Sequence, residues 1–348
     1  MKIRNTILLL TVSAVAAVSC NLFKPLDMDI DIPVDKSAET SSAALIGIEE
    51  ENHLTVDPNG DLILSFESGN SLSKSVSLSS TPQEVGTLEI SLADKPSISN
   101  GSEISNGQIV VEVDNPSDSP MLVRGTLSAA TKAAKTASFE FTVPAKTLKY
   151  KVLLQKAGTT ELQEAVDAKF NFSSDAGDVI DNSIVESNVK IAYSAGLAST
   201  KAGAAPAASN VTVNIATKLL FGMSFKKGST FKVVKKFSDM GLNLADYTVK
   251  SKEYDVHADV TNSMPFEISA TGESVQNIKA STDNPIAPGT KAAPVKTSVI
   301  ISVKDNSSNG VIEDAIVTLQ FKAASDGAKI NAKDGLKIAY KSIKVHQI

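Results

Sequence analysis

Residues 54–66 read LTVDPNGDLILSF, and this stretch decides the fold class. Large apolar residues recur at every second position on both sides of a turn: Leu54, Val56, Leu62, Leu64 and Phe66. Alternation with a period of two indicates strands that bury one face. The Asn59-Gly60 pair between the two runs supplies the positive φ angles of a type I′ turn. We therefore predict a β-hairpin at this position.

The same alternation continues along the chain. It predicts strands at residues 71–78, 109–113, 139–143, 211–215, 254–260, 299–303, 316–321 and 336–340. Lys341-Ser342 then shifts the parity, which indicates a bulge or a turn. One helix is expected after the capping box that begins at Thr160, because Leu162, Val166 and Phe170 follow at intervals of four.

Many short strands separated by turn residues predict antiparallel β-sandwiches. We expect an all-β fold with two tandem immunoglobulin-like antiparallel β-sandwich domains after a signal peptide. The chain has one Cys and no Trp, so the Cys–Trp–Cys core of antibody domains is absent. The likeness to immunoglobulins is therefore one of fold class alone.

Short repeats predict a duplicated body. The tetrapeptide KIAY occurs at 190–193 and again at 337–340, an offset of 147 residues. The tripeptides VDN at 113–115 and VTN at 260–262 share that offset, and TKAA at 131–134 recurs at 290–293. Three matches in the same order favour duplication, whereas similar strand composition by itself accounts for the alternation only.

These patterns give the expected domain boundaries. A signal peptide covers 1–19, and residues 20–44 form a lipid-anchored tether or contribute a first strand to the first module. The β-sandwich modules cover 45–194 and 210–348. Between them, residues 195–209 are rich in Ala, Gly and Ser and predict a linker.

The N-terminus has the layout of an export signal. Lys2 and Arg4 precede an uncharged, mostly apolar run at 7–18, and Cys20 follows. The run is too short for a spanning helix, which needs about 20 residues. An ordinary secretory signal cut after Ala14-Val15-Ala16 is the alternative to lipidation.

Ala17-Val18-Ser19-Cys20 resembles the lipobox of bacterial lipoproteins, with Ala17 in the place of the usual Leu. The resemblance implies covalent diacylglycerol and N-acyl lipid at Cys20 and no other cofactor. Two or more acyl chains are needed for stable anchoring. Asn21 after the Cys favours the outer membrane by analogy with Gram-negative lipoproteins.

The tandem layout, the acidic mature start and the ending Gly335-Leu336-Lys337-Ile338 resemble uncharacterised outer-membrane lipoproteins of Bacteroidota-type bacteria. This resemblance covers most of the chain and has no diagnostic motif beyond the lipobox. It implies a bacterial cell envelope location, lipid-anchored at the outer membrane. It carries no activity over to this chain.

Composition excludes several classes of protein. The apolar fraction of 42% is too high for a disordered chain, and one Cys cannot close an intramolecular disulfide. Acidic residues outnumber Lys and Arg by 39 to 34, which disfavours nucleic acid as a partner. We expect contact with the membrane through the lipid anchor.

Catalytic and metal-binding motifs are not apparent. The histidines His53, His257 and His346 lack ligand spacing, and the parity of its strand places His257 on the solvent side. Asp57, Asn59 and Asp61 have the spacing of a calcium loop without its glycine at position six. No nucleophile elbow, P-loop or dinucleotide fingerprint occurs, so no catalytic residue is assigned and we expect a protein that is not an enzyme.

The expected function is that of a lipid-anchored envelope protein whose duplicated modules bind a protein or glycan, in adhesion or surface assembly. Rigid sandwiches present loops for binding, and linked modules add avidity. The alternative is a carrier of lipid or another hydrophobic ligand in a cavity between the sheets. An enzyme with an unrecognised site is the weaker alternative.

Overall fold

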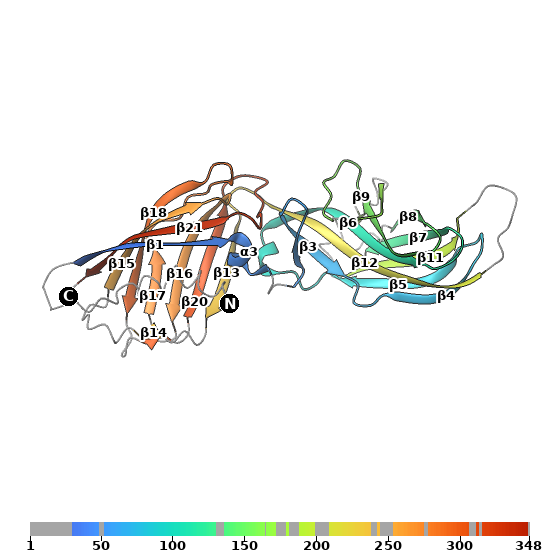
Figure 1. Cartoon of the computed structure of the whole chain (residues 1–348), viewed down its shortest axis with the longest axis horizontal. Coiled ribbons are helices and arrows are strands. Elements are labelled where there is room, and N and C mark those ends of the chain that lie inside the picture. The colour runs from blue at the N-terminus through green and yellow to red at the C-terminus, as the bar shows by residue number, and fades with distance from the viewer. Residues whose placement is uncertain are drawn as a thin grey trace. The chain divides into compact units, whose positions relative to one another are not determined.

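The computed structural model describes residues 30–48, 52–129, 136–163, 165–171, 179–180, 188–198, 209–237, 242–243, 253–274, 278–305, 311–312 and 315–346. The protein is nearly all β, with antiparallel sheets in a sandwich-like arrangement as expected (Figure 1). The chain divides into two compact units. The N-domain holds residues 51–96 and 104–223, and the C-domain holds residues up to 50, 97–103 and 224–348.

The N-domain consists of two sheets. The larger has the order β10-β9-β6-β12-β3-β2, with β4 also pairing with β12, and the smaller has the order β5-β11-β7-β8. The larger sheet comprises β2 (Leu54–Val56), β3 (Leu62–Glu67), β4 (Leu72–Leu78), β6 (Ser102–Asn115), β9 (Thr147–Gln155), β10 (Ala168–Asn171) and β12 (Ser209–Phe225). The smaller comprises β5 (Gln83–Ser91), β7 (Met121–Ala129), β8 (Thr136–Val143) and β11 (Asn188–Leu197).

Buried side chains from both sheets form the N-domain core. Phe66 on β3 and Phe221 on β12 are fully buried, with their ring centroids 6.2 Å apart. Tyr193 on β11 reaches across to the other sheet, where its hydroxyl lies 2.8 Å from Thr217 Oγ1. Burial raises the pKa of Tyr193 well above its usual value, so this phenol stays neutral.

The C-domain is built on one folded sheet with the order β1-β21-β15-β18-β17-β16-β20-β13. Its strands are β1 (Ile30–Ser41), β13 (Thr230–Phe237), β15 (Glu253–Asn262), β16 (Phe266–Ser274), β17 (Ile278–Thr282), β18 (Val295–Asp305), β20 (Ala315–Ala323) and β21 (Gly335–His346). Two short strands, β14 (Leu242–Asn243) and β19 (Val311–Ile312), pair separately, and the short helices are α3 (Ser42–Ile46) and η2 (Ser97–Ser99). Among the described helices, none is long and apolar enough to cross a membrane.

Four phenylalanines fill one end of the C-domain core. Phe231 stacks on Phe321 with ring centroids 4.7 Å apart, and Phe225 and Phe266 meet edge to face at 5.3 Å. Offset and edge-to-face pairs of this kind add stability beyond the area that they bury. This part of the interior is therefore packed with side chains.

The two domains share one topology. In the N-domain, β6 lies between β9 and β12, while β7 lies between β8 and β11, with β5 beyond β11. In the C-domain, β15 lies between β18 and β21, while β16 lies between β17 and β20, with β13 beyond β20. The matched strands follow in the same chain order. One difference is that β17 also pairs with β18, which joins the two halves of the C-domain into one sheet.

A buried asparagine confirms one of the three sequence repeats. Asn115 ends β6, accepts a hydrogen bond from the backbone N–H of Ser117 and donates to the carbonyl of Ser119. Asn262 ends β15, accepts from Met264 N–H and donates to the carbonyl of Phe266. The i+2 and i+4 partners coincide, so these two corners are equivalent.

The other two repeats do not mark equivalent positions. KIAY at 190–193 lies in β11, whose counterpart by topology is β20, whereas KIAY at 337–340 lies in β21. Both copies bury the Ile and the Tyr, which any strand with one buried face requires. TKAA at 131–134 falls outside the described residues between β7 and β8, while TKAA at 290–293 lies between β17 and β18.

The domain boundaries differ from those that the sequence predicts. Strand β12 pairs with β3 and β4, so the first module extends to Met223. The predicted linker, 195–209, begins within β11 and ends at the first residue of β12, and both strands belong to the N-domain. The segment predicted as a tether or a first-module strand contains β1, which pairs with β21 in the other domain. Both errors have the same cause, because long-range pairing leaves no local signal in composition.

The predicted hairpin at 54–66 is confirmed as β2–β3, but its turn is not type I′. Of the two central residues only Gly60 has a positive φ, at 91°. The carboxylate of Asp57 accepts hydrogen bonds from the N–H groups of Asn59 and Asp61, each at 2.8 Å. This Asx-type turn needs only one left-handed residue, and both of its hydrogen bonds go to Oδ1 of Asp57.

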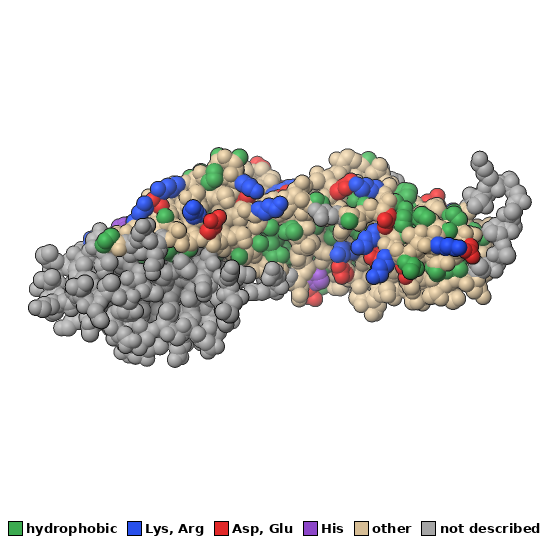
Figure 2. Space-filling model, in the orientation of Figure 1, with side chains coloured by type: hydrophobic (Ala, Val, Ile, Leu, Met, Phe, Trp, Pro, Cys, Tyr) green, Lys and Arg blue, Asp and Glu red, His purple; other side chains and the backbone are tan. Residues whose placement is uncertain are grey.

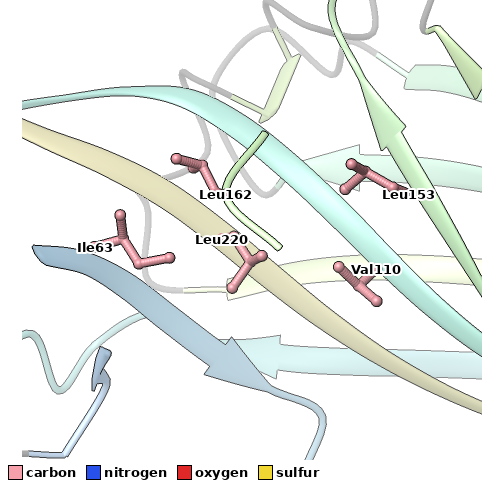
Figure 3. Close-up of a cluster of buried hydrophobic side chains, with 5 residues drawn as sticks. All are labelled: Ile63, Val110, Leu153, Leu162 and Leu220. Carbon is pink, nitrogen blue, oxygen red and sulfur yellow. The ribbon is translucent and has the colours of Figure 1, made fainter. Parts of the chain in front are cut away.

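The helix predicted after Thr160 is wrong. The described residues of 156–167 form an irregular segment without a helix, here called the strap, which packs on the outer face of the larger N-domain sheet. Leu162 is 5% exposed and packs on Ile63, Val110, Leu153 and Leu220 (Figure 3). The buried Gln108 side chain pins the strap, since it donates to the Thr160 carbonyl at 2.6 Å and accepts from Leu162 N–H at 2.9 Å.

Candidate functional site

The residues predicted to carry the lipid anchor lie outside the described part of the chain. These are Cys20 and the lipobox residues Ala17, Val18 and Ser19. The acidic run at 49–51 also lies outside it. Lipidation accordingly stays a prediction from sequence.

His53 contacts residues of the β2–β3 hairpin. It occupies a left-handed conformation with φ of 65° before β2, and its ring stacks on Phe66 with centroids 4.7 Å apart. Its Nδ1 lies 3.2 Å from the carbonyl oxygen of Ser65. These contacts hold the start of the hairpin.

A polar strip on the outer face of the C-domain sheet is the candidate functional site. Asp255, His257 and Asp259 project outward from β15, while Val256 and Ala258 between them are buried. This confirms the orientation predicted for His257. Strand β18 supplies Ser298 and Ser302 on one side, and β21 supplies Lys341 and His346 on the other. We call these seven residues, together with Lys296, the polar strip.

Asp259 is the most strongly engaged carboxylate of the strip. Its oxygens lie 2.6 Å from Lys296 Nζ, 2.7 Å from Ser298 Oγ and 3.3 Å from Lys341 Nζ. Hydrogen bonds from Lys296 and Ser298 lower the pKa of Asp259 to about 2. The carboxylate is therefore ionised at any ordinary pH, although its side chain is only 12% exposed.

Asp255 is the second carboxylate of the strip that neighbouring side chains hold in place. Ser302 Oγ donates to it at 2.7 Å, and His346 Nε2 lies 2.8 Å from its other oxygen. Burial raises the pKa of Asp255, but the hydrogen bonds from Ser302 and His346 outweigh burial and hold the pKa below its usual value. His257 adds a favourable charge interaction with the same carboxylate.

An open hollow of about 490 Å³ lies in the strip, lined in part by His257, Asp283 and Lys341. Asp283 Oδ1 accepts a hydrogen bond from Ile300 N–H at 2.8 Å, which fixes that carboxylate against β18. The hollow offers hydrogen-bond donors and acceptors of both charges at set positions. Such a surface suits a polar ligand.

The geometry of the strip does not match a nucleophilic triad. In a triad a histidine stands between serine and carboxylate, whereas Asp255 stands between Ser302 and His346. A carboxylate with a pKa of about 2, such as Asp259, is a poor general base. Among the described residues, no three His, Cys, Asp or Glu side chains form a metal-binding group.

The sequence predicts that His257 points outward from β15. It does not predict that side chains of β18 and β21 meet those of β15 on this face. The predicted parity shift at Lys341-Ser342 is confirmed as a bulge opposite His257 and Ala258. This bulge brings Lys341 to Asp259 and keeps His346 on the outer face beside Asp255. The alternating Asp-x-His-x-Asp of 255–259 was the available signal, but its partners depend on strand register.

A second recess of about 540 Å³ lies in the N-domain, next to the edge strands β8 and β10. Phe139, Leu154 and Phe170 contribute apolar surface, while Arg124 and Glu140 form an ion pair of 3.0 Å. Phe139 crosses the strand β7 at Gly125, where a Cβ would lie 2.1 Å from the ring. This recess is the apolar feature most relevant to the carrier alternative.

Charges on the visible face of the molecule are mixed. Figure 2 shows Lys and Arg side chains interspersed with Asp and Glu side chains. Ion pairs among the described residues include Lys218 with Glu67 at 2.7 Å and Lys226 with Glu103 at 2.8 Å. A field of mixed sign does not attract a polyanion.

Comparison with known proteins identifies no family. No family model matches the chain, and no curated protein matches it. Among solved structures, a "putative secreted protein" of the Bacteroidota bacterium Parabacteroides distasonis is 14% identical and covers 92% of this chain and 100% of its own, with a TM-score of 0.42.

Two further solved structures are more distant. The VP2 subviral particle protein of infectious bursal disease virus is 10% identical, over 78% of this chain and 44% of its own, with a TM-score of 0.23. The CBM22-1–CBM22-2 tandem domain of Xyn10C from Paenibacillus barcinonensis is 9% identical, over 91% of this chain and 99% of its own, with a TM-score of 0.19.

Proposed function

We propose that this protein is a lipid-anchored protein of the bacterial outer membrane that binds a polar partner, a protein or a glycan, through its β-sandwich modules. The observation that carries the proposal is the polar strip. Its carboxylates Asp255 and Asp259 are held by five hydrogen-bond or ion-pair partners, Ser302, His346, Lys296, Ser298 and Lys341. Side chains that are ordered before binding lose little conformational entropy on binding.

The strip supports recognition rather than chemistry. Its serines donate to carboxylates and are therefore not activated by a histidine. It lies on the strands of a sheet, and groups on rigid elements hold their positions better than groups on loops. These features support the proposal of a non-catalytic binding or structural role, in adhesion or surface assembly.

Binding is tested with the purified protein on an array of glycans and envelope polysaccharides of defined structure. Asp259→Asn removes the charge at the centre of the strip, so we expect at least a tenfold loss of affinity for any ligand found. Glu267→Gln is the matched control, because Glu267 also pairs with a lysine, Lys322 at 3.3 Å, elsewhere on the same sheet. Equal effects of the two substitutions would exclude the strip as the binding surface.

Anchoring is tested by Cys20→Ser in the full-length precursor. The wild type should incorporate labelled palmitate and sediment with outer membranes, because stable attachment requires the acyl chains. The variant should lose both properties, and a variant that still sediments with membranes would contradict the proposal. Protease shaving of intact cells then distinguishes the cell surface from the periplasmic face.

The recess beside β8 and β10 favours a second candidate function, the carriage of a hydrophobic ligand. Its volume of about 540 Å³ falls within the size range of small-molecule sites. A fluorescent fatty acid should then bind to the wild type with micromolar affinity. The Phe170→Asp variant should not bind it, because the substitution places a charge in the recess. Failure of both the fatty acid and a phospholipid to bind would remove this candidate.

A further inference from the structure

Strand β1 completes the C-domain from the opposite end of the chain. In the N-domain, β3 and β4 occupy the place beside β12. The segment that precedes β13 in the chain is β12, which pairs within the N-domain and belongs to it as far as Met223. The equivalent place beside β21 is therefore not filled from the neighbouring sequence. Residues 30–41 take this place and pair antiparallel with β21, from Ile30 opposite Val345 to Ser41 opposite Gly335 (Figure 1).

Strands β1 and β21 approach each other closely near the C-terminal end of β1. A Cβ on Gly335 would lie 2.0 Å from the carbonyl oxygen of Thr40, so only glycine allows the strands to approach in this way. Thr40 is buried, whereas Ser37 on the same strand is exposed. Strand β1 therefore has one face that belongs to the C-domain core.

Helix α3 extends the docking beyond the strand. Leu45 and Ile46 are buried. The backbone N–H of Ser42 donates to the Asp334 carbonyl at 2.7 Å, and its hydroxyl donates to the Asn331 carbonyl at 2.5 Å. Residues 30–46 are thus held by backbone pairing, buried side chains and a capped end.

The expected lipid anchor lies close in the sequence to this docked segment. Cys20 precedes Ile30 by ten residues, and ten extended residues span at most about 35 Å. A lipid on Cys20 therefore reaches the body of the protein first at the C-domain, although that domain comes last in the sequence. The chain enters the N-domain only after residue 50.

We propose that β1 and α3 form a docking segment, residues 30–46, whose non-covalent pairing with β21 attaches the body of the protein to the membrane lipid. This inference rests on the proposed lipid anchor at Cys20. The peptide bonds at residues 49–51 are then not needed for retention. Force applied to the anchor acts on the β1–β21 ladder before it acts on the N-domain.

The test uses the full chain with a site-specific protease sequence inserted at residues 49–51, in outer-membrane vesicles. Before cleavage, sedimentation with the vesicles reports the lipid anchor alone. After cleavage, we expect at least 90% of the body to stay on the vesicles in buffer and to be released by denaturing urea. Release on cleavage in buffer would overturn the inference while leaving the anchor established.

If the uncut protein is soluble, the proposed anchor fails and the docking is still measured. In that case the cleaved protein is passed over a size-exclusion column. Co-elution of the N-terminal fragment with the body supports docking, and separation of the two overturns it.

Substitutions on the two faces of β1 test whether retention of the body depends on the buried face of the strand. Thr40→Asp places a charge on the buried face and should release most of the body after cleavage, whereas Ser37→Asp on the exposed face should release none. A cysteine pair, Ser37→Cys with Ala339→Cys, links directly opposed residues. It should retain the body in urea until a reductant is added, and each single cysteine variant should not. The docking would be contradicted if the body of the Thr40→Asp variant stayed on the vesicles after cleavage. It would also be contradicted if urea without a reductant released the body of the double-cysteine variant.

Discussion

At the scale of single residues, Asp259 shows how the fold controls charge. Its pKa of about 2 lies below the ordinary value of 3.8, because Lys296 and Ser298 donate to the carboxylate. A group whose pKa is lowered in the folded state stabilises the fold above its unfolded pKa. That contribution is lost as the pH falls from about 4 towards 2.

We predict that Asp259→Asn destabilises the protein at pH 7 and has a much smaller effect at pH 2. The asparagine cannot pair with Lys296 and Lys341, so the loss should be largest where the wild-type carboxylate is ionised. Urea unfolding between pH 2 and 7 measures the difference in free energy. A difference that does not change with pH would contradict this assignment.

Individual residues were predictable where their role depends on local parity. The outward orientation of His257 and the bulge at Lys341 follow from alternation alone. The partners of Asp255 and Asp259 do not, because they come from strands about 40 to 90 residues away, at Ser298, Ser302 and His346. Register between distant strands decides these contacts, and one sequence does not record it.

At the scale of elements, the strap shows that side chains with helical spacing can belong to a segment that is not a helix. Leu162 and Phe170 satisfy the spacing of a helix, yet they reach different surfaces. Leu162 packs on the outer face of the larger N-domain sheet. Phe170 lies in β10, with its ring centroid 6.0 Å from that of Phe141. The strands were predictable because each of them buries one face. The strap instead depends on contacts with distant residues, such as the hydrogen bonds from Gln108 and Asn106 to its backbone.

We predict that Leu162→Ala loosens the strap without disrupting the sheet beneath it. Removing a buried leucine side chain costs about 2–4 kcal/mol in a well-packed site. Proteolysis within 156–167 should accelerate, because Leu162 is the most deeply buried side chain of the strap. The hydrogen bonds of Gln108, Asn106 and Asp167 and the packing of Val166 remain, so the strap loosens without leaving the sheet. Mass spectrometry of the first cleavage products locates the cut. The exposed Leu148→Ala is the control and should leave the cleavage rate unchanged.

At the scale of the whole molecule, the sequence predicted two related sandwiches but not which strands belong to which. Duplication is supported by the shared strand order and by the corners at Asn115 and Asn262. The allocation of β1 and β12 depends on pairing over long distances in the chain. Neither composition nor periodicity contains that information.

The equivalence of the two corners leads to a prediction for unfolding. Asn115 and Asn262 are each fully buried, and each donates through Nδ2 to backbone carbonyls of its own domain. Substitution by Asp keeps the shape but removes these donors, and it turns a carboxyl oxygen towards the same carbonyl oxygens, which adds a repulsive contact. Each buried group left unsatisfied costs about 1–3 kcal/mol, which lowers a melting temperature by roughly 2–4 °C per kcal/mol in a domain of this size.

Because each domain has its own core, calorimetry should resolve two transitions. Asn115→Asp should lower one and Asn262→Asp the other. Gly335→Ala should lower the same transition as Asn262→Asp, since the clash with Thr40 disturbs the sheet that holds Asn262. If Gly335→Ala lowered the transition that responds to Asn115, β1 would not belong to the C-domain in solution. If all three variants shifted one common transition, the domains would unfold as a single cooperative unit.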